Sequence, residues 1–314
     1  MNRSIEIVEV SPRDGLQNEK VALSTTDKLA LIDRLIAVGA KRIEVASFVN
    51  PRRVPQMADA EAVIAGLPSA PGVTFIGLTL NERGVDRAAA ANAASPRGLD
   101  QVGCVLVATD SFGIANQGQT VAEGLAANRA MIAAATAAGM SAQVTISGSF
   151  GCPFEGEVAE DHVLGLAEEM AAAGAVEIAF ADTIGVAVPA QVGSMIAEAR
   201  KRLGDRFPIR VHLHDTRGMA PANAWAAWQE GCPTFDSALG GLGGCPFAPN
   251  SAGNLATEEL IYLFKRTGID TGLDLDKAVS ANRWLSERMG KPLPSRVGRA
   301  GDFIPQPQSR QECA

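Results

Sequence analysis

Apolar, β-branched runs alternate with amphipathic stretches along almost the entire chain. Short runs of this kind, separated by glycine, proline or polar residues, are typical of strands. They predict eight strands, at residues 5–10, 42–47, 74–79, 102–108, 143–147, 177–181, 209–213 and 234–238.

The segments between these runs carry the pattern of helices that pack on a sheet. One apolar stripe at helical spacing runs through Val192, Met195, Ile196, Ala199 and Leu203. Pro189 stands near the start of this stripe and Gly204 just past its end, which is the asymmetry expected of a helix. Residues 27–38 behave likewise and are closed by Gly39, because glycine readily adopts the left-handed conformation that turns a helix into the next strand.

Eight β units with helices between them predict an α/β fold, the (β/α)8 TIM barrel with a short C-terminal extension. We expect one catalytic domain over residues 1–290, followed by a partly disordered tail over residues 291–314 that is rich in Pro, Arg and Gln. A doubly wound open sheet is the alternative. No Gly-x-Gly-x-x-Gly motif follows the first strand, which favours the barrel.

Composition narrows the expected partners. Residues are 46% hydrophobic and 20% charged, as in an ordinary globular enzyme. The net charge is −7 and no lysine- or arginine-rich block is present, so nucleic acid is not an expected partner. No apolar run reaches the roughly 18 residues of a membrane span. Residues 1–4 run directly into the first strand, which leaves no room for a signal peptide, so we expect a cytoplasmic protein.

The cysteines support the same compartment. They are five in number, widely spaced and without a Cys-x-x-Cys pair, which argues against a disulfide framework and for a reducing cytosol. Cys104, Cys152 and Cys232 lie in apolar or turn contexts, so we expect them to be inert packing residues.

Residues 210–218, Arg-Val-His-Leu-His-Asp-Thr-Arg-Gly, are the most informative stretch for chemistry. They include His212 and His214, two of only three histidines in the chain. On a strand, side chains at i and i+2 point to the same face, so both imidazoles converge as two ligands of one metal ion do. A buried pair satisfied by backbone hydrogen bonds is the alternative. The scarcity of histidine and the Asp215 that follows favour a metal.

Further polar residues gather where the predicted strands end, which is where such barrels place their chemistry. Arg13 and Asp14 follow the first strand, Glu44 lies in the second, and Asp182 follows the sixth. Each has a simpler interpretation. Arg13 and Asp14 also fit an ion pair at a turn, Glu44 fits an interior carboxylate with its hydrogen bonds satisfied, and Asp182 fits a cap of the next helix. Because separate strands bring these positions to one rim, we interpret them together as an active site.

The eighth strand leads into the glycine-rich residues 240–244, which we expect to form a mobile loop that brings Cys245 toward the rim. Glycines alone also fit a tight turn or a phosphate cradle. Two histidines and one carboxylate leave coordination positions open, as in a catalytic metal site. No cysteine lies near the pair in sequence, so oxygen-preferring Mg²⁺ or Mn²⁺ is the favoured ion.

Several longer motifs follow one another along the chain. They are Val-Ser-Pro-Arg-Asp-Gly-Leu-Gln-Asn-Glu (10–19), Ser-Phe-Val-Asn-Pro (47–51), Val-Pro-Gln-Met (54–57), Gly-Cys-Pro-Phe-Glu-Gly (151–156), Asp-Thr-Ile-Gly-Val (182–186), His-Leu-His-Asp-Thr (212–216), Gly-Leu-Gly-Gly-Cys-Pro-Phe-Ala (241–248) and Gly-Asn-Leu-Ala-Thr-Glu (253–258). In these motifs, over about residues 5–290, the chain resembles the hydroxymethylglutaryl-CoA lyases. That family consists of metal-dependent TIM-barrel enzymes.

The resemblance implies roles for particular residues. The metal ligands it implies are Asp14, His212, His214 and Asn254. The catalytic set it implies is Arg13, Asp14, Glu44, Asp182, His212 and Cys245. Within that set Arg13 stabilises a developing enolate, Cys245 acts in proton transfer, and Glu44 and Asp182 support the site.

The reaction implied by the resemblance is a retro-Claisen cleavage of 3-hydroxy-3-methylglutaryl-CoA to acetyl-CoA and acetoacetate. The metal, Mg²⁺ or Mn²⁺, binds the C3 hydroxyl and the carboxylate of the substrate. As the C2–C3 bond breaks, negative charge moves to the thioester oxygen, where Arg13 is a suitable fixed cation. The expected partners are an acyl-CoA substrate and a second copy of the chain in a homodimer.

Departures from the family pattern leave the acyl group open. They lie at Ala181, at residues 219–221 and at residues 249–252. A lyase for a related 3-hydroxyacyl-CoA, longer-branched or citramalyl-type, is therefore an alternative. Lys20, Arg52 and Arg53 are candidates for contacts with CoA phosphates, and solvated surface charge is the alternative for them.

Two other classes of protein are weaker alternatives. A Claisen-type condensing transferase shares the barrel and the His-x-His site, but it usually carries Asn where this chain has Asp215, and often a long C-terminal regulatory region. A non-enzymatic metal- or acyl-CoA-binding protein is disfavoured by the complete catalytic set.

Overall fold

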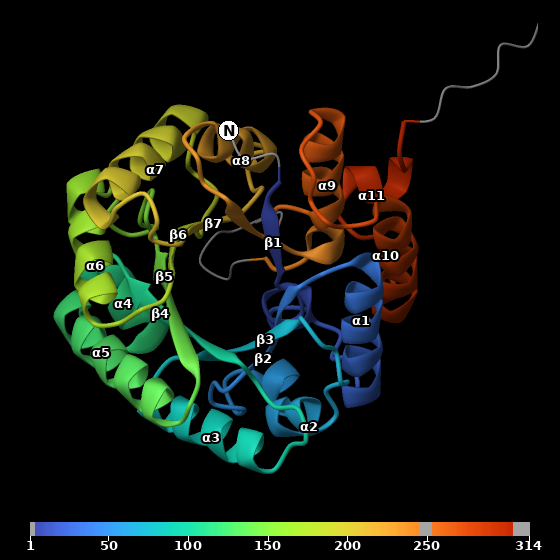
Figure 1. Ribbon diagram of the computed structural model, residues 1–314, viewed down its shortest axis with the longest axis horizontal. Coiled ribbons are helices and arrows are strands. Elements are labelled where there is room, and N and C mark those ends of the chain that lie inside the picture. Colours follow the sequence, from blue (N-terminus) through green and yellow to red (C-terminus); the bar gives the residue numbers. More distant parts are fainter. Residues whose placement is uncertain (1–3, 245–252, 304–314) are drawn as a thin grey trace, which may run out of the picture.

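The computed structural model describes residues 4–244 and 253–303, which form a closed ring of parallel strands surrounded by helices (Figure 1). The strands are β1 (Glu6–Glu9), β2 (Arg42–Ser47), β3 (Thr74–Thr79), β4 (Gln101–Val107), β5 (Ser141–Ser147), β6 (Ile178–Asp182), β7 (Ile209–Leu213) and β8 (Thr234–Ser237). Neighbours in sequence pair in parallel, and β8 closes the ring against β1. The predicted (β/α)8 barrel is confirmed.

The helices form the outer layer of the barrel (Figure 1). They are α1 (Thr25–Val38), α2 (Ala60–Ala65), α3 (Glu82–Ala93), α4 (Asp110–Gln117), α5 (Val121–Ala137), α6 (Glu160–Ala172), α7 (Pro189–Leu203), α8 (Ala220–Gln229), α9 (Thr257–Arg266), α10 (Leu275–Met289) and α11 (Arg296–Ala300). No helix in the described part of the chain has both the length and the apolar character needed to cross a bilayer.

Observed and predicted boundaries differ by at most two residues. Helix α1 begins two residues earlier than predicted, because the hydroxyl of Ser24 accepts the backbone N–H of Asp27 and caps it. Helix α7 begins at Pro189 and ends before Gly204, as predicted. Strand β6 is shifted by one residue, so Asp182 is its last residue rather than the first residue after it.

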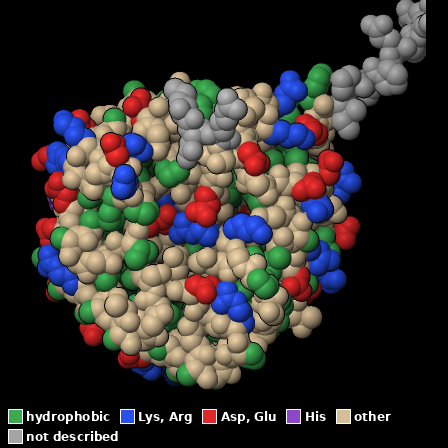
Figure 2. All heavy atoms as spheres, in the orientation of Figure 1, with side chains coloured by type: hydrophobic (Ala, Val, Ile, Leu, Met, Phe, Trp, Pro, Cys, Tyr) green, Lys and Arg blue, Asp and Glu red, His purple; other side chains and the backbone are tan. Residues whose placement is uncertain are grey.

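Apolar side chains fill the layer between the strands and the helices. Phe75, Phe180 and Phe235 lie on three different strands and are completely buried in this layer. The interior of the ring, by contrast, is strongly polar. It includes the buried side chains of Gln143, Glu177, Arg210 and Asp236. On the face shown in Figure 2, acidic and basic side chains lie together over the middle of the ring.

The described part of the predicted tail is folded against the barrel. Helix α11 packs on α9 and α10. The side chain of Arg296 approaches the carboxylate of Asp215, with 3.3 Å between nitrogen and oxygen. The segment after residue 290 therefore contacts the loop that follows the histidine pair, while residues 304–314 lie outside the described part.

Candidate active site

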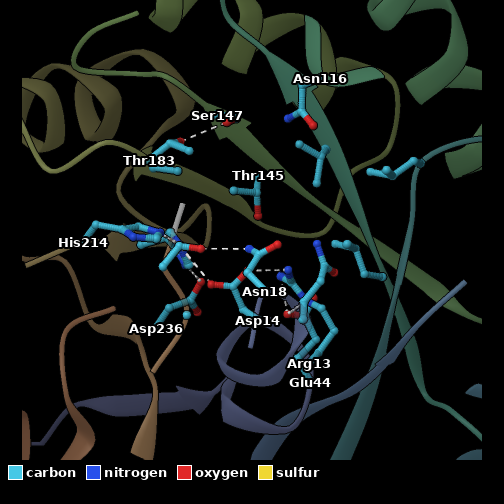
Figure 3. Close-up of a pocket in the computed structure, with 18 of the residues that line it drawn as sticks. Arg13, Asp14, Asn18, Glu44, Asn116, Thr145, Ser147, Thr183, His214 and Asp236 are labelled. Atoms are coloured by element: carbon cyan, nitrogen blue, oxygen red, sulfur yellow. Dashed lines mark hydrogen bonds and ion pairs between the residues drawn. The ribbon is translucent and has the colours of Figure 1, made fainter. Parts of the chain in front are cut away.

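Three side chains able to bind a metal meet at the C-terminal ends of the strands (Figure 3). Asp14 lies in a π-helical turn, η1 (Ser11–Gly15), directly after β1. His212 lies in β7, and His214 follows that strand. The Nε2 atom of His212 is 3.2 Å from Nε2 of His214 and 3.9 Å from Oδ2 of Asp14. The structure thus brings the predicted histidine pair and the predicted carboxylate together.

The spacing of these atoms suits one divalent ion. Ligand bonds of about 2.1 Å that meet at roughly 90–110° place neighbouring ligand atoms about 3.0–3.4 Å apart. The 3.2 Å between the two imidazole nitrogens falls in that range, and the 3.9 Å between Nε2 of His212 and Oδ2 of Asp14 lies above it. Their convergence follows from the strand itself, because residues i and i+2 share one face.

Asp236, in β8, sets the orientation of His212. Its Oδ2 lies 3.0 Å from Nδ1 of His212, so the carboxylate accepts the Nδ1–H and Nε2 faces the cluster. Burial lowers the pKa of His212, but the hydrogen bond and charge of Asp236 outweigh burial and raise it. Burial raises the pKa of Asp236, but the charge of Arg210 and the contact with His212 outweigh this and hold that pKa below its usual value. Asp236 is therefore a carboxylate, the form that accepts this hydrogen bond.

Burial and neighbouring charges also keep the other two members of the cluster in ligand form. Burial, with a contribution from His212, lowers the pKa of His214 to about 3, so its imidazole is neutral near pH 7. Burial raises the pKa of Asp14, but the charge of Arg13, with contributions from the neighbouring imidazoles and the hydrogen bond of Asn254, outweighs burial and holds that pKa at about 2. A neutral imidazole and an ionised carboxylate are the forms that bind a cation.

Asn254 lies beside the cluster and is the fourth predicted metal ligand. Its Nδ2 donates to Oδ2 of Asp14 at 2.7 Å and to the carbonyl of Leu242 at 2.9 Å. Its Oδ1 is buried and has no hydrogen-bond partner among the described residues. A buried acceptor left unpaired costs about 1–3 kcal/mol, which a cation would offset. Two imidazoles, a carboxylate and an amide oxygen fit an ion such as Mg²⁺ or Mn²⁺.

Arg13 lies between two carboxylates at the edge of the cluster (Figure 3). Its Nη1 is 2.5 Å from Oδ1 of Asp14, while Nε and Nη2 are 2.6 and 2.5 Å from Oε2 of Glu44. These contacts fix the plane of the guanidinium. They leave at least two of its five N–H groups without a partner in the described part of the chain. Arg13 is thus an oriented cation with donors available to a ligand.

Asp182 does not line the pocket that holds the cluster. Its carboxylate oxygens accept the backbone N–H groups of Val186 at 2.8 Å and Ala187 at 3.0 Å. Its own carbonyl accepts the N–H of His214 at 3.3 Å. These contacts lie in the loop before α7, whose N-cap is Val188, so Asp182 organises that loop rather than capping the helix. A direct catalytic role for it stays a prediction.

The glycine-rich segment after β8 packs against the ligands. The N–H of Gly240 points at both carboxylate oxygens of Glu258, at 3.1 and 3.0 Å. Gly243 has a φ of +102°, and a Cβ there would lie 2.2 Å from Nδ2 of Asn254. Glycine at this position therefore allows the backbone to approach a predicted metal ligand closely. Cys245, the predicted proton-transfer residue, lies outside the described residues.

We expect Gly243→Ala to weaken Mn²⁺ binding by about tenfold and to lower the free energy of unfolding by about 1–3 kcal/mol. The alanine would be strained at the positive φ of this position, and its Cβ would displace the side chain of Asn254. Mn²⁺ titration and thermal unfolding measure the two effects. Gly139→Ala is the matched control. Gly139 has a φ of +78° with nothing within 4 Å of the added Cβ, so this variant should lose stability alone. Unchanged Mn²⁺ affinity in Gly243→Ala would contradict the packing argument.

The rest of the pocket was not foreseen from the sequence. Several polar side chains and one aromatic ring line it, namely Gln17, Asn18, Phe112, Asn116, Thr145, Ser147 and Thr183. Figure 3 shows Thr145, Ser147 and Thr183 across the pocket from Arg13. The hydroxyls of Ser147 and Thr183 are 2.9 Å apart. Applying the strand-end rule to every polar residue, and not only to charged ones, would have found most of this set.

The predicted CoA-phosphate contacts are not part of this pocket. Lys20, Arg52 and Arg53 are exposed and do not line it, so their contact with CoA stays a prediction. All three cysteines that we expected to be packing residues, Cys104, Cys152 and Cys232, are buried. Burial raises the pKa of Cys104 to about 11 and that of Cys232 to about 12, which keeps both as neutral thiols.

A (β/α)8 barrel with two histidines and a carboxylate at its strand ends is typical of barrel enzymes that use a divalent metal. The family described as HMGL-like matches residues 4–285. The chain is 43% identical over 313 residues to (R)-citramalyl-CoA lyase of Chloroflexus aurantiacus, covering 96% of each. It is 39% identical to hydroxymethylglutaryl-CoA lyase YngG of Bacillus subtilis, covering 94% of this chain and 96% of the relative.

Solved structures give the same result. An HMG-CoA lyase from Acinetobacter baumannii, in complex with coenzyme A and 3-methylmalate, superposes with a TM-score of 0.90 at 35% identity and covers 97% of this chain and 98% of its own. The HMG-CoA lyase from Bacillus subtilis superposes with a TM-score of 0.88 at 38% identity, covering 96% and 99%. The chain therefore belongs to the HMGL-like family, whose relatives named here are carbon–carbon lyases.

Proposed function

We propose that this protein is a divalent-metal-dependent lyase that cleaves 3-hydroxy-3-methylglutaryl-CoA to acetyl-CoA and acetoacetate. The observation that carries the proposal is the position of Arg13, which contacts Asp14 of the His212–His214 cluster in a pocket at the strand ends. Similarity along nearly the whole chain to hydroxymethylglutaryl-CoA lyase YngG supports the substrate class.

The reaction breaks the bond between C2 and C3 of the acyl group. The C3 hydroxyl loses its proton, and C3 becomes the ketone of acetoacetate. The electron pair of the broken bond passes to C2 and the thioester oxygen as an enolate, and a proton delivered to C2 completes acetyl-CoA. One proton leaves and one is returned, so the reaction needs no oxidant or reductant.

Asp14, His212, His214 and Asn254 would hold the metal. A divalent ion at this position supplies a Lewis acid that lowers the pKa of a bound hydroxyl. The protein prepares the site in two ways. Asp236 holds the Nε2 of His212 toward the other ligands, and burial keeps His214 neutral.

Arg13 is suited to the enolate. Its charge is permanent, and its contacts with Asp14 and Glu44 fix its plane before any substrate arrives. A donor that is already oriented needs no reorganisation when negative charge develops on the thioester oxygen. Arg13 and Glu44 are close enough for an ion pair, with 2.5 Å between Nη2 and Oε2. Burial raises the pKa of Glu44, and the charge of Arg13 opposes that shift.

Cys245 is the proposed proton donor to the enolate. We expect Cys245→Ser to fold normally and to lose about 10²–10⁴ in kcat, the usual range for a general acid–base group. Steady-state kinetics measure the loss, and circular dichroism checks the fold. Cys313→Ser is the matched control and should keep full activity. An acyl-thioester trapped on Cys245 in mass spectrometry would count against the proton-transfer role.

(R)-Citramalyl-CoA is a second candidate substrate. The observation that favours it is the 43% identity to the Chloroflexus citramalyl-CoA lyase over 96% of both chains. Its hydroxyl, methyl and carboxylate groups share one carbon, so it is shorter by one methylene, and its cleavage gives acetyl-CoA and pyruvate. The same bond type breaks in both substrates, and Arg13 and the metal ligands would serve either one.

A comparison of kcat/KM across HMG-CoA, citramalyl-CoA and longer-branched 3-hydroxyacyl-CoA thioesters tests the proposal. We expect HMG-CoA to be preferred, with acetoacetate as the co-product. A tenfold or greater preference for citramalyl-CoA, with pyruvate released, would move the function to the second candidate. No cleavage of any thioester by the metal-loaded protein would refute the lyase.

With HMG-CoA as its substrate, the protein would act in leucine degradation and ketone-body formation. We place that activity in the cytoplasm and expect the enzyme to be a homodimer. Light scattering coupled to size-exclusion chromatography measures its mass in solution.

A further inference from the structure

A chain of buried ionic contacts crosses the barrel interior and ends at the metal cluster. Arg42, in β2, donates to the two carboxylate oxygens of Glu177 at 2.9 and 2.7 Å. Arg210, in β7, donates to the same carboxylate at 3.0 Å and also to Asp236 in β8. Asp236 then accepts the Nδ1–H of His212 at 3.0 Å. Four charged side chains thus lead to one predicted metal ligand.

Arg210 is the centre of this chain. Its three guanidinium nitrogens each donate to a different oxygen, on Glu177, Asp236 and Gln143. Arg210 is only 3% exposed, and both of its carboxylate partners are buried as well. A planar guanidinium held at three corners has one orientation, so Arg210 is a fixed point in the barrel interior.

Asp236 is held between that fixed point and the metal cluster. Arg210 binds its Oδ1, and His212 donates to its Oδ2. Because the guanidinium holds one carboxylate oxygen, the other oxygen is aimed at the imidazole. We propose that Arg210 is a positioning residue for the metal centre, which acts through Asp236 to keep Nε2 of His212 facing Asp14. This inference rests on the metal-dependent function proposed above.

Arg42 provides the comparison that separates positioning from simple core stability. It donates to the same Glu177 and to the same oxygen of Gln143, so it belongs to the same network. Among the contacts of the described residues, however, Arg42 has none with Asp236. Removing Arg42 disturbs the network at its far end and leaves the Arg210–Asp236 contact in place.

The experiment measures Mn²⁺ affinity without substrate, from the electron paramagnetic resonance signal of free Mn²⁺, together with the Tm of each protein in EDTA. We expect Arg210→Met to weaken Mn²⁺ binding by about 10–100-fold, the range for a residue that supports a metal ligand. Asp236→Asn should lose a similar factor. Arg42→Met should bind Mn²⁺ within about threefold of wild type, even where its Tm falls.

The double variant Arg210→Met/Asp236→Asn tests the route of the effect. If Arg210 acts through Asp236, the double variant binds Mn²⁺ within about threefold of Asp236→Asn alone, because the two changes interrupt the same contact. The double variant also tests the proposal if Arg210→Met alone fails to fold. Without Arg210, Asp236 would be a buried carboxylate that lacks its partner, and Asp236→Asn removes that charge.

Three results would overturn the proposal. They are wild-type Mn²⁺ affinity in folded Arg210→Met, an equal loss in Arg42→Met, and a further loss of about tenfold or more in the double variant relative to Asp236→Asn. Failure of the wild-type protein to bind Mn²⁺ is a different result, because it would refute the metal-dependent function itself.

Discussion

Arg13→Lys is expected to lower kcat by about 10²–10³ while KM changes little. An interaction made mainly in the transition state appears as lost kcat, and one oriented donor to an oxyanion is worth about this factor. Lysine keeps the charge. Its ammonium group, however, cannot contact both Asp14 and Glu44 in one plane and still present free N–H groups to the substrate. Steady-state kinetics with HMG-CoA measure the effect.

Two further substitutions test whether this loss of kcat is specific to the guanidinium of Arg13. Arg13→Met should be as poor as Arg13→Lys or worse, because it removes the charge as well. Arg206→Lys is the matched control, since Arg206 is exposed and does not line the pocket, and it should leave kcat unchanged. If Arg13→Lys instead kept near-normal kcat and raised KM about tenfold or more, Arg13 would bind the ground state. The enolate would then depend on the metal or on backbone donors.

His214→Ala is expected to weaken Mn²⁺ binding by more than about 10²-fold and to lower turnover by a similar factor. It removes an imidazole nitrogen that lies 3.2 Å from its neighbour in the cluster, and replacing groups that merely support a ligand already costs about 10–100-fold. EDTA treatment of the wild-type protein should abolish activity, and Mg²⁺ or Mn²⁺ should restore it. Metal titration and activity assays measure both effects.

The third histidine supplies the control. His162 lies in α6, and its Nε2 is 2.8 Å from the carbonyl of Ala108, away from the cluster. His162→Ala should therefore lose some stability, about 1 kcal/mol for one hydrogen bond, and keep its Mn²⁺ affinity. Full activity in metal-stripped wild-type protein, or normal Mn²⁺ affinity in His214→Ala, would refute the metal site.

The barrel and the core of the site were open to sequence reasoning because both depend on local periodicity. The apolar run of β7 predicts a strand, and the period of two along a strand puts His212 and His214 on one face. Arg13, Asp14 and Glu44 could be grouped without knowing any distance, because the C-terminal ends of parallel strands share one rim of a barrel. The structure places these five residues in one pocket.

The supporting contacts could not be predicted, because they depend on which strands become neighbours in the closed ring. In sequence, Arg210 and Asp236 are isolated charges within buried strands, and only the pairing of β7 with β8 shows that they meet. Asn254 was inferred from family resemblance alone, since an amide ligand leaves no periodic pattern. For Asp182, the contacts with Val186 and Ala187 lie in the loop before α7, whose N-cap is Val188, so it organises that loop and does not cap the helix.

The hydrogen bond between Asn254 and Asp14 joins residues 240 positions apart in the chain. The closure of so long a loop costs conformational entropy, which the contacts it allows must offset. The ligand set is therefore complete only in a ring that has closed between β1 and β8. A cation that binds only the closed ring stabilises it by mass action. We therefore expect the free energy needed to separate β1 from β8 to rise with the concentration of free metal.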